Sequence, residues 1–212
     1  MTGASRSAPV LVCFAVPQEA KSFLKRTRGR EDVRCLITGM GARNAETSLR
    51  GALKEFSPVR VLTCGFAGGL HPDLKIGDVV CAHDMPLPGV RPVQFACTER
   101  VAITVAEKAA LRTQTGADAV EMESAIIARV CREFAVSCQT LRVISDTAHE
   151  DLPLDFNELM TSEQKLSPVK LAWAMARSPQ RIPALMQLGK NSALAGERLA
   201  DVLVTVLRPP EK

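Results

Sequence analysis

Short apolar runs alternate with segments of helical spacing over the first two thirds of the chain. Residues 10–16 are apolar and rich in valine, which predicts a buried strand, and Pro17 then opens a segment with helical spacing. The pattern predicts strands at residues 10–16, 33–38, 60–64, 78–82, 119–122 and 138–145, and helices at residues 17–25, 44–56, 106–115 and 124–134. Strands that alternate with helices favour a mostly parallel sheet covered by helices on both faces.

The C-terminal quarter of the chain has a different pattern. Residues 155–207 show no strand signal, and prolines stand at the starts of the helical segments or between them. Helices are predicted at residues 168–177, 183–190 and 192–207, and the proline-rich segment 86–92 is expected to be a loop. We therefore expect one α/β domain over residues 1–212, with a central, mostly parallel mixed sheet and a helical C-terminal cover at 155–207.

The start of the helix predicted at residues 106–115 carries a specific signal. Thr104 precedes it and Glu107 follows three residues later, which is the arrangement of a capping box. Gly116 is expected to end this helix.

Composition excludes several classes of protein. The 212 residues carry a net charge of +4, and aromatic residues make up 4% with no tyrosine, which argues against a nucleic-acid-binding surface of stacked rings. The seven cysteines form no Cys-x-x-Cys pair and the three histidines lack ligand spacing, so we expect a reducing compartment and no metal site. The apolar run at residues 10–16 is too short to span a membrane, and residues 1–9 lack the layout of a secretion signal, so we expect a cytoplasmic protein without an integral membrane segment.

Two glycine-rich segments follow predicted strands. Residues 65–69 hold three glycines, more than a tight turn needs, so contact with a ligand is favoured over a simple turn. Gly39-Met40-Gly41 ends a strand and opens a helix, as in a phosphate-binding turn, and Arg43 at the helix start either holds an anion or is solvated. Asn44 stands where the third glycine of a dinucleotide fingerprint belongs, which disfavours a nicotinamide or flavin enzyme.

Glu121 and Glu123 flank Met122 where a strand passes into a helix. A carboxylate at this place could accept hydrogen bonds from two neighbouring hydroxyl groups of a sugar. The alternative is that Glu123 is an acidic residue favoured at a helix N-terminus by the helix dipole.

Two further acidic residues lie at predicted strand ends. Asp146 follows Ser145 at the end of a strand, where partial desolvation could keep a carboxyl group protonated for donation to a ring nitrogen. The alternative is that Asp146 caps the next turn. Glu19 follows the first strand and could orient an attacking water molecule, or it could be an exposed helix residue.

Taken in order, these motifs resemble the nucleoside phosphorylase family, and most closely its 5′-methylthioadenosine/S-adenosylhomocysteine nucleosidases and hopanoid-associated phosphorylases. The resemblance covers residues 10–151. The matching segments are Glu19, Gly39-Met40-Gly41, Gly65-Phe66-Ala67-Gly68-Gly69-Leu70, residues 75–80, Glu121-Met122-Glu123 and Ser145-Asp146. The chain departs from the family at Phe66, where other members have serine, and its segment 82–104 is shorter than the base-contacting region of the nucleosidases.

Two other stretches resemble the hopanoid-associated branch. The first comprises residues 106–111 and then 115–117, leading into Met122-Glu123-Ser124, and the second comprises residues 178–185. This resemblance implies that the substrate is an adenosyl compound such as adenosylhopane.

The family resemblance implies a phosphorylase-like fold and an enzyme that cleaves the N-glycosidic bond of a purine nucleoside or adenosyl compound, by phosphorolysis or hydrolysis. It implies catalytic roles for Asp146 and Glu19, and ribose binding by Glu123, Met122 and Glu121. The expected base or phosphate pocket comprises Gly65, Phe66, Ala67, Gly68, Ser145, Arg142, Gly41 and Arg43.

The resemblance also implies a homodimer without a metal or organic cofactor, a small-molecule substrate as the partner, and phosphate as a candidate co-substrate. The main alternative is a non-catalytic nucleoside- or lipid-binding protein on the same fold, which Phe66 and the shortened segment 82–104 motivate.

Overall fold

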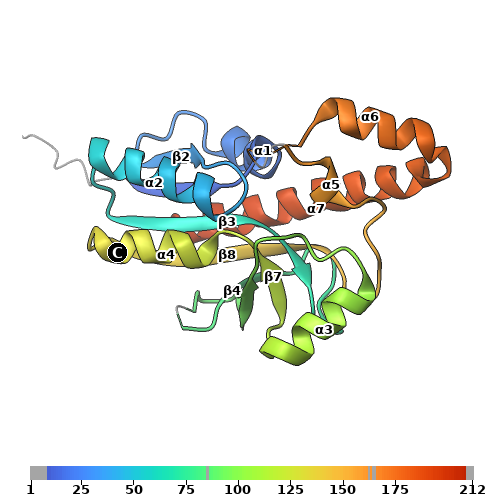
Figure 1. Cartoon of the computed structure of the whole chain (residues 1–212). Helices are drawn as coiled ribbons and strands as arrows, with labels where there is room; N and C mark the ends of the chain where they lie inside the picture. The colour runs from blue at the N-terminus through green and yellow to red at the C-terminus, as the bar shows by residue number, and fades with distance from the viewer. Residues whose placement is uncertain (1–8, 85, 162, 164–165, 209–212) are drawn as a thin grey trace, which may run out of the picture.

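The computed structural model describes residues 9–84, 86–161, 163 and 166–208. Their centre is an eight-stranded sheet (Figure 1). The strands are β1 (Val10–Phe14), β2 (Val33–Ile37), β3 (Arg60–Gly69), β4 (Val79–Ala82), β5 (Arg91–Val93), β6 (Phe95–Cys97), β7 (Ala119–Glu121) and β8 (Ser137–Asp146). The helices are α1 (Pro17–Arg26), α2 (Ala42–Glu55), α3 (Val105–Thr115), α4 (Ser124–Glu133), α5 (Phe156–Leu159), α6 (Pro168–Arg177) and α7 (Ile182–Val206), with a 3₁₀ turn, η1 (Pro179–Arg181), before α7.

The sheet is mixed and mostly parallel, as the sequence predicted. The strand order is β2-β1-β3-β8-β4-β5, and β7 joins the end of β3 and also pairs with β6. The pairs β1–β2, β1–β3, β3–β8, β4–β5 and β6–β7 are parallel, whereas β4–β8 and β3–β7 are antiparallel.

Helices cover both faces of the sheet and enclose two main apolar cores. Successive residues of β1 point to opposite faces, so Val12 packs beneath α1 and α7 whereas Leu11 packs beneath α2 and α4. Figure 1 shows α2 and α4 side by side over one face and α7 running behind the sheet. The capping box predicted for α3 is confirmed, because Glu107 N donates to Thr104 Oγ1 and Gly116 ends the helix in the left-handed conformation.

The two longest strands, β3 and β8, bring the chain to the candidate site. They pair in parallel along their full length, with a bulge between Ala67 and Gly68 that sets Gly68 opposite Asp146. Beyond the bulge, β7 pairs with Gly68 and Gly69. The end of β8, the end of β3 and the residues after β7 therefore meet at one place.

Three details differ from the sequence prediction. The strand predicted to end at residue 64 continues as β3 through Gly69, because the glycine-rich segment pairs with β8 and β7. The predicted loop 86–92 runs into β5, in which Pro92 is tolerated because β5 is at the sheet edge. Residues 183–207, predicted as two helices, form the single helix α7, since the polar stretch 187–192 lies on its exposed or partly exposed surface and does not interrupt its backbone.

Among the described residues, none of the helices combines the length and the apolar character needed to cross a membrane.

Candidate active site

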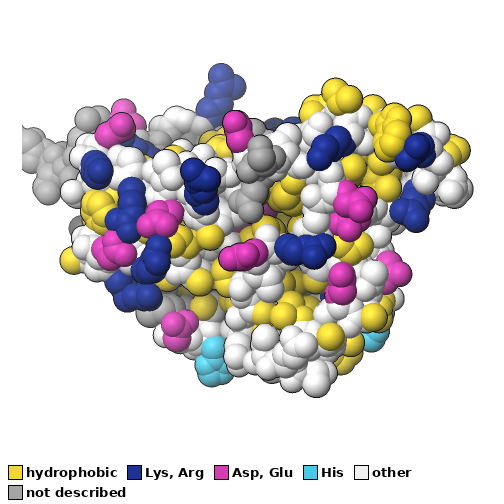
Figure 2. Space-filling model, in the orientation of Figure 1, with side chains coloured by type: hydrophobic (Ala, Val, Ile, Leu, Met, Phe, Trp, Pro, Cys, Tyr) yellow, Lys and Arg dark blue, Asp and Glu magenta, His cyan; other side chains and the backbone are white. Residues whose placement is uncertain are grey.

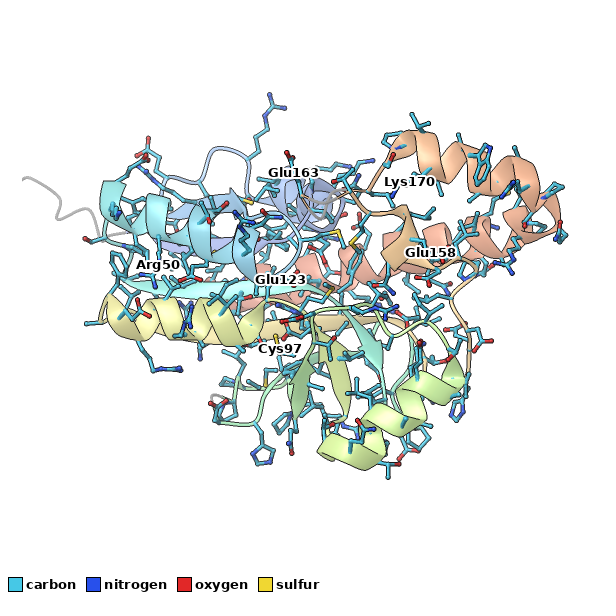
Figure 3. All side chains as sticks on the ribbon, in the orientation of Figure 1. Arg50, Cys97, Glu123, Glu158, Glu163 and Lys170 are labelled. Atoms are coloured by element: carbon cyan, nitrogen blue, oxygen red, sulfur yellow. The ribbon has the colours of Figure 1, made fainter. Side chains whose placement is uncertain are left out.

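A cavity of about 230 Å³ lies at the carboxyl ends of β1, β3 and β8. Four acidic residues lie in its wall, namely Glu19, Glu121, Glu123 and Asp146. Figure 3 shows Glu123 near the middle of the molecule, beside the first turn of α4. The remaining lining residues are Ala15, Val16, Met40, Phe66, Ala67, Gly68, Thr98, Arg100, Val101, Ala102, Val120, Met122 and Ser145. The sequence-predicted acids are thus brought together at the carboxyl ends of the strands, where ligands bind in open α/β sheets.

Glu19, in the first turn of α1, is held by three backbone donors. Its Oε2 accepts hydrogen bonds from the amides of Ala15 (2.9 Å) and Val16 (3.2 Å), and its Oε1 accepts one from Phe66 (2.8 Å). Burial raises the pKa of Glu19 against the opposing effect of these hydrogen bonds. Gly65 allows this approach, because it has φ +151° and a Cβ there would lie 2.7 Å from Glu19 Oε1.

Glu123 precedes α4 and is 9% exposed. Its Oε1 accepts a hydrogen bond of 2.8 Å from the amide of Gly41, which itself precedes α2. Burial raises the pKa of Glu123 to about 7, and the attraction of Arg142 and the Gly41 hydrogen bond only partly offset this effect. Glu123 is therefore a carboxyl group that changes charge near neutral pH.

The carboxylate of Glu121 makes an ion pair and hydrogen bonds with other residues of the protein. Its Oε2 lies 2.7 Å from Arg142 Nη2 and accepts the amides of Ser124 (2.8 Å) and Glu123 (3.1 Å), while Oε1 accepts Ser124 Oγ (2.6 Å). Burial alone would raise the pKa of Glu121, but the ion pair with Arg142 and the hydrogen bonds of Ser124 and Glu123 outweigh it and lower the pKa. These contacts fix the chain at the β7–α4 junction and so position Met122 and Glu123.

Arg142 supports the cavity from behind. It is 1% exposed, is absent from the cavity wall, and also donates to Thr63 Oγ1 (3.1 Å). Of the other residues predicted for the base or phosphate pocket, Gly41 and Gly65 act behind the wall through Glu123 and Glu19, and Arg43 is exposed away from it. Phe66, Ala67, Gly68 and Ser145 do line the cavity.

Asp146, the last residue of β8, is bound at both carboxylate oxygens. Ser145 Oγ donates to Oδ1 (2.8 Å) and Lys108 Nζ donates to Oδ2 (2.6 Å). Lys108 belongs to α3, is fully buried and was not identified from the sequence. Its only sequence signal is its place four residues after the N-cap Thr104, where a lysine on a surface helix is ordinarily solvated.

The wall also includes Thr98, Arg100, Val101 and Ala102, which follow β6 and were not predicted as site residues. Phe66, Val101 and Ala102 add apolar side chains to the wall.

The charges of the site are divided unequally. Two carboxylates are paired with buried cations, Glu121 with Arg142 and Asp146 with Lys108. Glu19 and Glu123 have no cation within ion-pair distance among the described residues. Among the residues that the structure describes, no group of three or more histidine, cysteine or acidic side chains could hold a metal ion. The arrangement suits a ligand with hydroxyl groups and a positive charge that develops during reaction.

The chain is thus an α/β protein with an acid-lined cavity at the carboxyl ends of its strands. A family model described as the phosphorylase superfamily matches residues 12–98 and 88–174. The chain belongs to this superfamily, as its motifs predicted.

Two curated relatives with similar sequences carry the same enzyme name. The 5′-methylthioadenosine/S-adenosylhomocysteine nucleosidase of a Marinomonas species is 31% identical over 183 residues, covering 65% of this chain and 78% of the relative. The enzyme of the same name from Anoxybacillus flavithermus is 30% identical over 183 residues, covering 66% and 78%.

Solved structures share the fold. The corresponding nucleosidase of Campylobacter jejuni superposes with a TM-score of 0.67 at 18% identity, covering 94% of this chain and 98% of that one. Futalosine hydrolase of Helicobacter pylori superposes with a TM-score of 0.69 at 17% identity, covering 96% and 99%. These structures confirm the predicted mixed α/β fold, and the curated relatives confirm the prediction of an enzyme that cleaves N-glycosidic bonds.

Proposed function

We propose that the chain hydrolyses the N-glycosidic bond of an adenosyl compound, with water as the nucleophile. The observation that carries this proposal is the acid-lined cavity, whose wall holds both Glu123 and Asp146. The nucleosidases and the hydrolase that the chain resembles are named for the same type of reaction.

Each lining acid has a role in this proposal. Ionised Glu123 accepts hydrogen bonds from the ribose hydroxyl groups, and Met122 packs beneath the sugar. As the bond to the base breaks, the sugar becomes positively charged, and the nearby carboxylates stabilise that charge. Asp146 contacts the departing base and passes it a proton, a step that contributes about 10²–10⁴-fold to the rate. Glu19, on the α1 side, orients the attacking water.

Electrostatics favour water over phosphate. Four carboxyl groups line the cavity, and of the lining residues, all in the described part of the chain, Arg100 is the one basic side chain and is exposed. The buried cations Arg142 and Lys108 are already engaged by Glu121 and Asp146. A phosphate dianion would therefore enter a cavity lined by four carboxyl groups, with exposed Arg100 as the one basic side chain among the described residues of the wall to offset them.

The proposal also concerns the base and the 5′ substituent of the substrate. The names of the relatives favour adenosyl compounds with a sulfur-linked 5′ group. The resemblance of residues 106–111, 115–117 and 178–185 to the hopanoid-associated branch favours an adenosyl lipid. Both classes of compound present the same ribose and base to Glu123 and Asp146. Assays with a compound of each class would therefore show which class the chain cleaves.

A homodimer in the cytoplasm remains part of the proposal. Large apolar side chains are exposed on α6 and at the start of α7, namely Val169 (78%), Trp173 (59%) and Met186 (62%). Figure 2 shows hydrophobic side chains gathered over the region of α6. Such a surface is typical of an interface, and light scattering at micromolar concentration would give twice the chain mass of 22.9 kDa.

The test of the reaction type uses two buffers. The purified chain is incubated with 5′-methylthioadenosine, S-adenosylhomocysteine or adenosine, with and without inorganic phosphate, and free adenine is measured. Equal release in both buffers is expected. Release that requires phosphate would replace hydrolysis by phosphorolysis, and no release from any of these compounds or from an adenosyl lipid would contradict the enzymatic proposal.

A further inference from the structure

Lys108 is the one fully buried lysine among the described residues, and it is bound on three sides. Its Nζ donates to Asp146 Oδ2 (2.6 Å), to the carbonyl oxygen of Thr147 (2.7 Å) and to that of Glu150 (3.0 Å). An ammonium group has three hydrogens, so each is used. Lysine is almost never fully buried without such partners.

Lys108 is also the only buried residue of α3. A helix that merely covered the loop after β8 would present apolar side chains to it. Although half-buried Leu111 of α3 packs against a small apolar cluster, the one fully buried side chain of the helix carries an ammonium group, and this group is bound to Asp146. The cost of removing this charge from water makes a purely structural use of lysine unfavourable compared with an apolar residue of similar size.

The hydrogen bonds at Asp146 decide which group carries the proton. Both of its oxygens accept, Oδ1 from Ser145 and Oδ2 from Lys108. A carboxyl hydrogen on Oδ2 would be directed at an ammonium group, which has no acceptor. In the arrangement that the structure shows, both oxygens of Asp146 accept hydrogen bonds, and the adjacent group that has a proton to give is Lys108.

We infer that Lys108 is a positioning residue that holds the proton which Asp146 passes to the departing base, so that the acid of the reaction is the Lys108–Asp146 pair. This inference rests on the proposed N-glycosidic cleavage.

The step balances without another reactant. As the glycosidic C–N bond breaks, its electron pair goes to the base, a proton moves from Lys108 Nζ to Asp146 Oδ2, and Asp146 releases it to a ring nitrogen. The pair is left as a neutral amine and a carboxylate. The attacking water loses one proton to solvent by way of Glu19, and the amine takes one proton up again. The sum is nucleoside plus water giving base plus sugar.

Other charged groups around Lys108 have partners of their own. In the loop after β8, Glu150 Oε1 accepts the Thr147 amide, and Asp151 Oδ1 accepts the Val105 amide. On α3, Glu107 accepts the Ile103 and Thr104 amides, and Arg112 pairs with Asp118. His149, in the same loop, lies with Nε2 3.2 Å from the carbonyl oxygen of Pro72. Asp146 is the one carboxylate in contact with the Lys108 ammonium among the described residues.

The decisive substitution is Lys108→Arg. A guanidinium group keeps the positive charge and donates to carboxylate and carbonyl oxygens, but it does not release a proton in proteins. If Lys108 holds the proton, the arginine variant retains binding of a non-reactive adenosyl analogue and loses at least 100-fold in kcat. If Lys108 only holds the charge and the loop, kcat stays within about tenfold of wild type, which would overturn the inference.

The pH profile of Lys108→Met gives a second test. Without the ammonium group, the proton must reside on the Asp146 carboxyl itself, so the alkaline fall of kcat is expected at least one pH unit below that of wild type. An unchanged profile in a folded variant would contradict the inference. Lys170→Met is the matched control, because exposed Lys170 (Figure 3) also donates to two backbone carbonyls, those of Glu158 and Met160, but lies away from the cavity.

A measurement on the wild type covers the case in which neither Lys108 variant folds. In ¹⁵N-lysine-labelled protein, the Lys108 Nζ resonance should have the ammonium shift at neutral pH and titrate together with the alkaline fall of kcat. A fall of kcat while Lys108 is still charged would overturn the inference. Absence of base release by wild type would instead count against the proposed function, so the two failures are distinguishable.

Discussion

The substitution Glu123→Gln should stabilise the protein at alkaline pH and abolish its activity. Glu123 is 9% exposed, and burial raises its pKa from the ordinary 4.5 to about 7. A raised pKa means that the folded state favours the protonated, neutral form. The charged form therefore destabilises the folded state, with no cost below pH 4.5 and the full cost above pH 7.

The size of the effect follows from the same shift. A change of pKa from 4.5 to about 7 corresponds to about 3 kcal/mol of unfolding free energy above pH 7. Glutamine keeps an oxygen to accept the Gly41 amide and carries no charge. For a chain of this length, ~3 kcal/mol corresponds to roughly 6–12 °C in Tm.

The assay is thermal or urea denaturation at pH 4.5 and pH 8. The variant should match wild type at the lower pH and exceed its stability by about 3 kcal/mol at the higher pH. Glu55→Gln, at an exposed position on α2, is the control and should show no such difference. A Glu123→Gln variant that is less stable than wild type at pH 8, or a gain independent of pH, would refute the reasoning. If ionised Glu123 binds the ribose, as proposed, kcat/KM of wild type should also rise as pH passes through about 7.

Two further substitutions test the support of the site. Gly65→Ala places a methyl group 2.7 Å from Glu19 Oε1, at a residue with φ +151°. The substitution should therefore displace Glu19 and reduce kcat for adenine release by at least about tenfold. Full activity of the variant would show that Glu19 is not needed in this position. Arg142→Met leaves the 4%-exposed Glu121 without its cation, so urea denaturation at pH 7 should show a loss of about 3–5 kcal/mol. In that case the double variant Arg142→Met with Glu121→Gln should recover part of the loss, and an additive loss would argue against the ion pair as the cause.

Local signals in the sequence predicted much of the fold. The capping box of Thr104 and Glu107 and the terminal Gly116 depend on neighbours within a few residues, so they could be recognised directly. The continuation of β3 through residues 65–69 depends on pairing with β8, about 77 positions later in the chain. That partner is not visible to a local pattern, and glycine-rich composition favours a turn instead.

The candidate site was predicted unevenly for a similar reason. The motif residues Glu19, Glu123 and Asp146 line one cavity, because each lies at the end of a strand of the same sheet or shortly after it. Lys108 and the structural use of Arg142 depend on which acids lie opposite them after folding. A lysine in a helix looks like a solvated residue, and Arg142 was expected in the base or phosphate pocket, so neither ion pair could be recognised before that geometry was known.

The most direct measurement of the central claim is release of free adenine from 5′-methylthioadenosine in phosphate-free buffer, by wild type and by Asp146→Asn. The account predicts release by wild type and a kcat at least about 100-fold lower for the variant, with binding of the substrate retained. Equal turnover by both proteins, or no release by wild type from this or any other adenosyl compound, would contradict it.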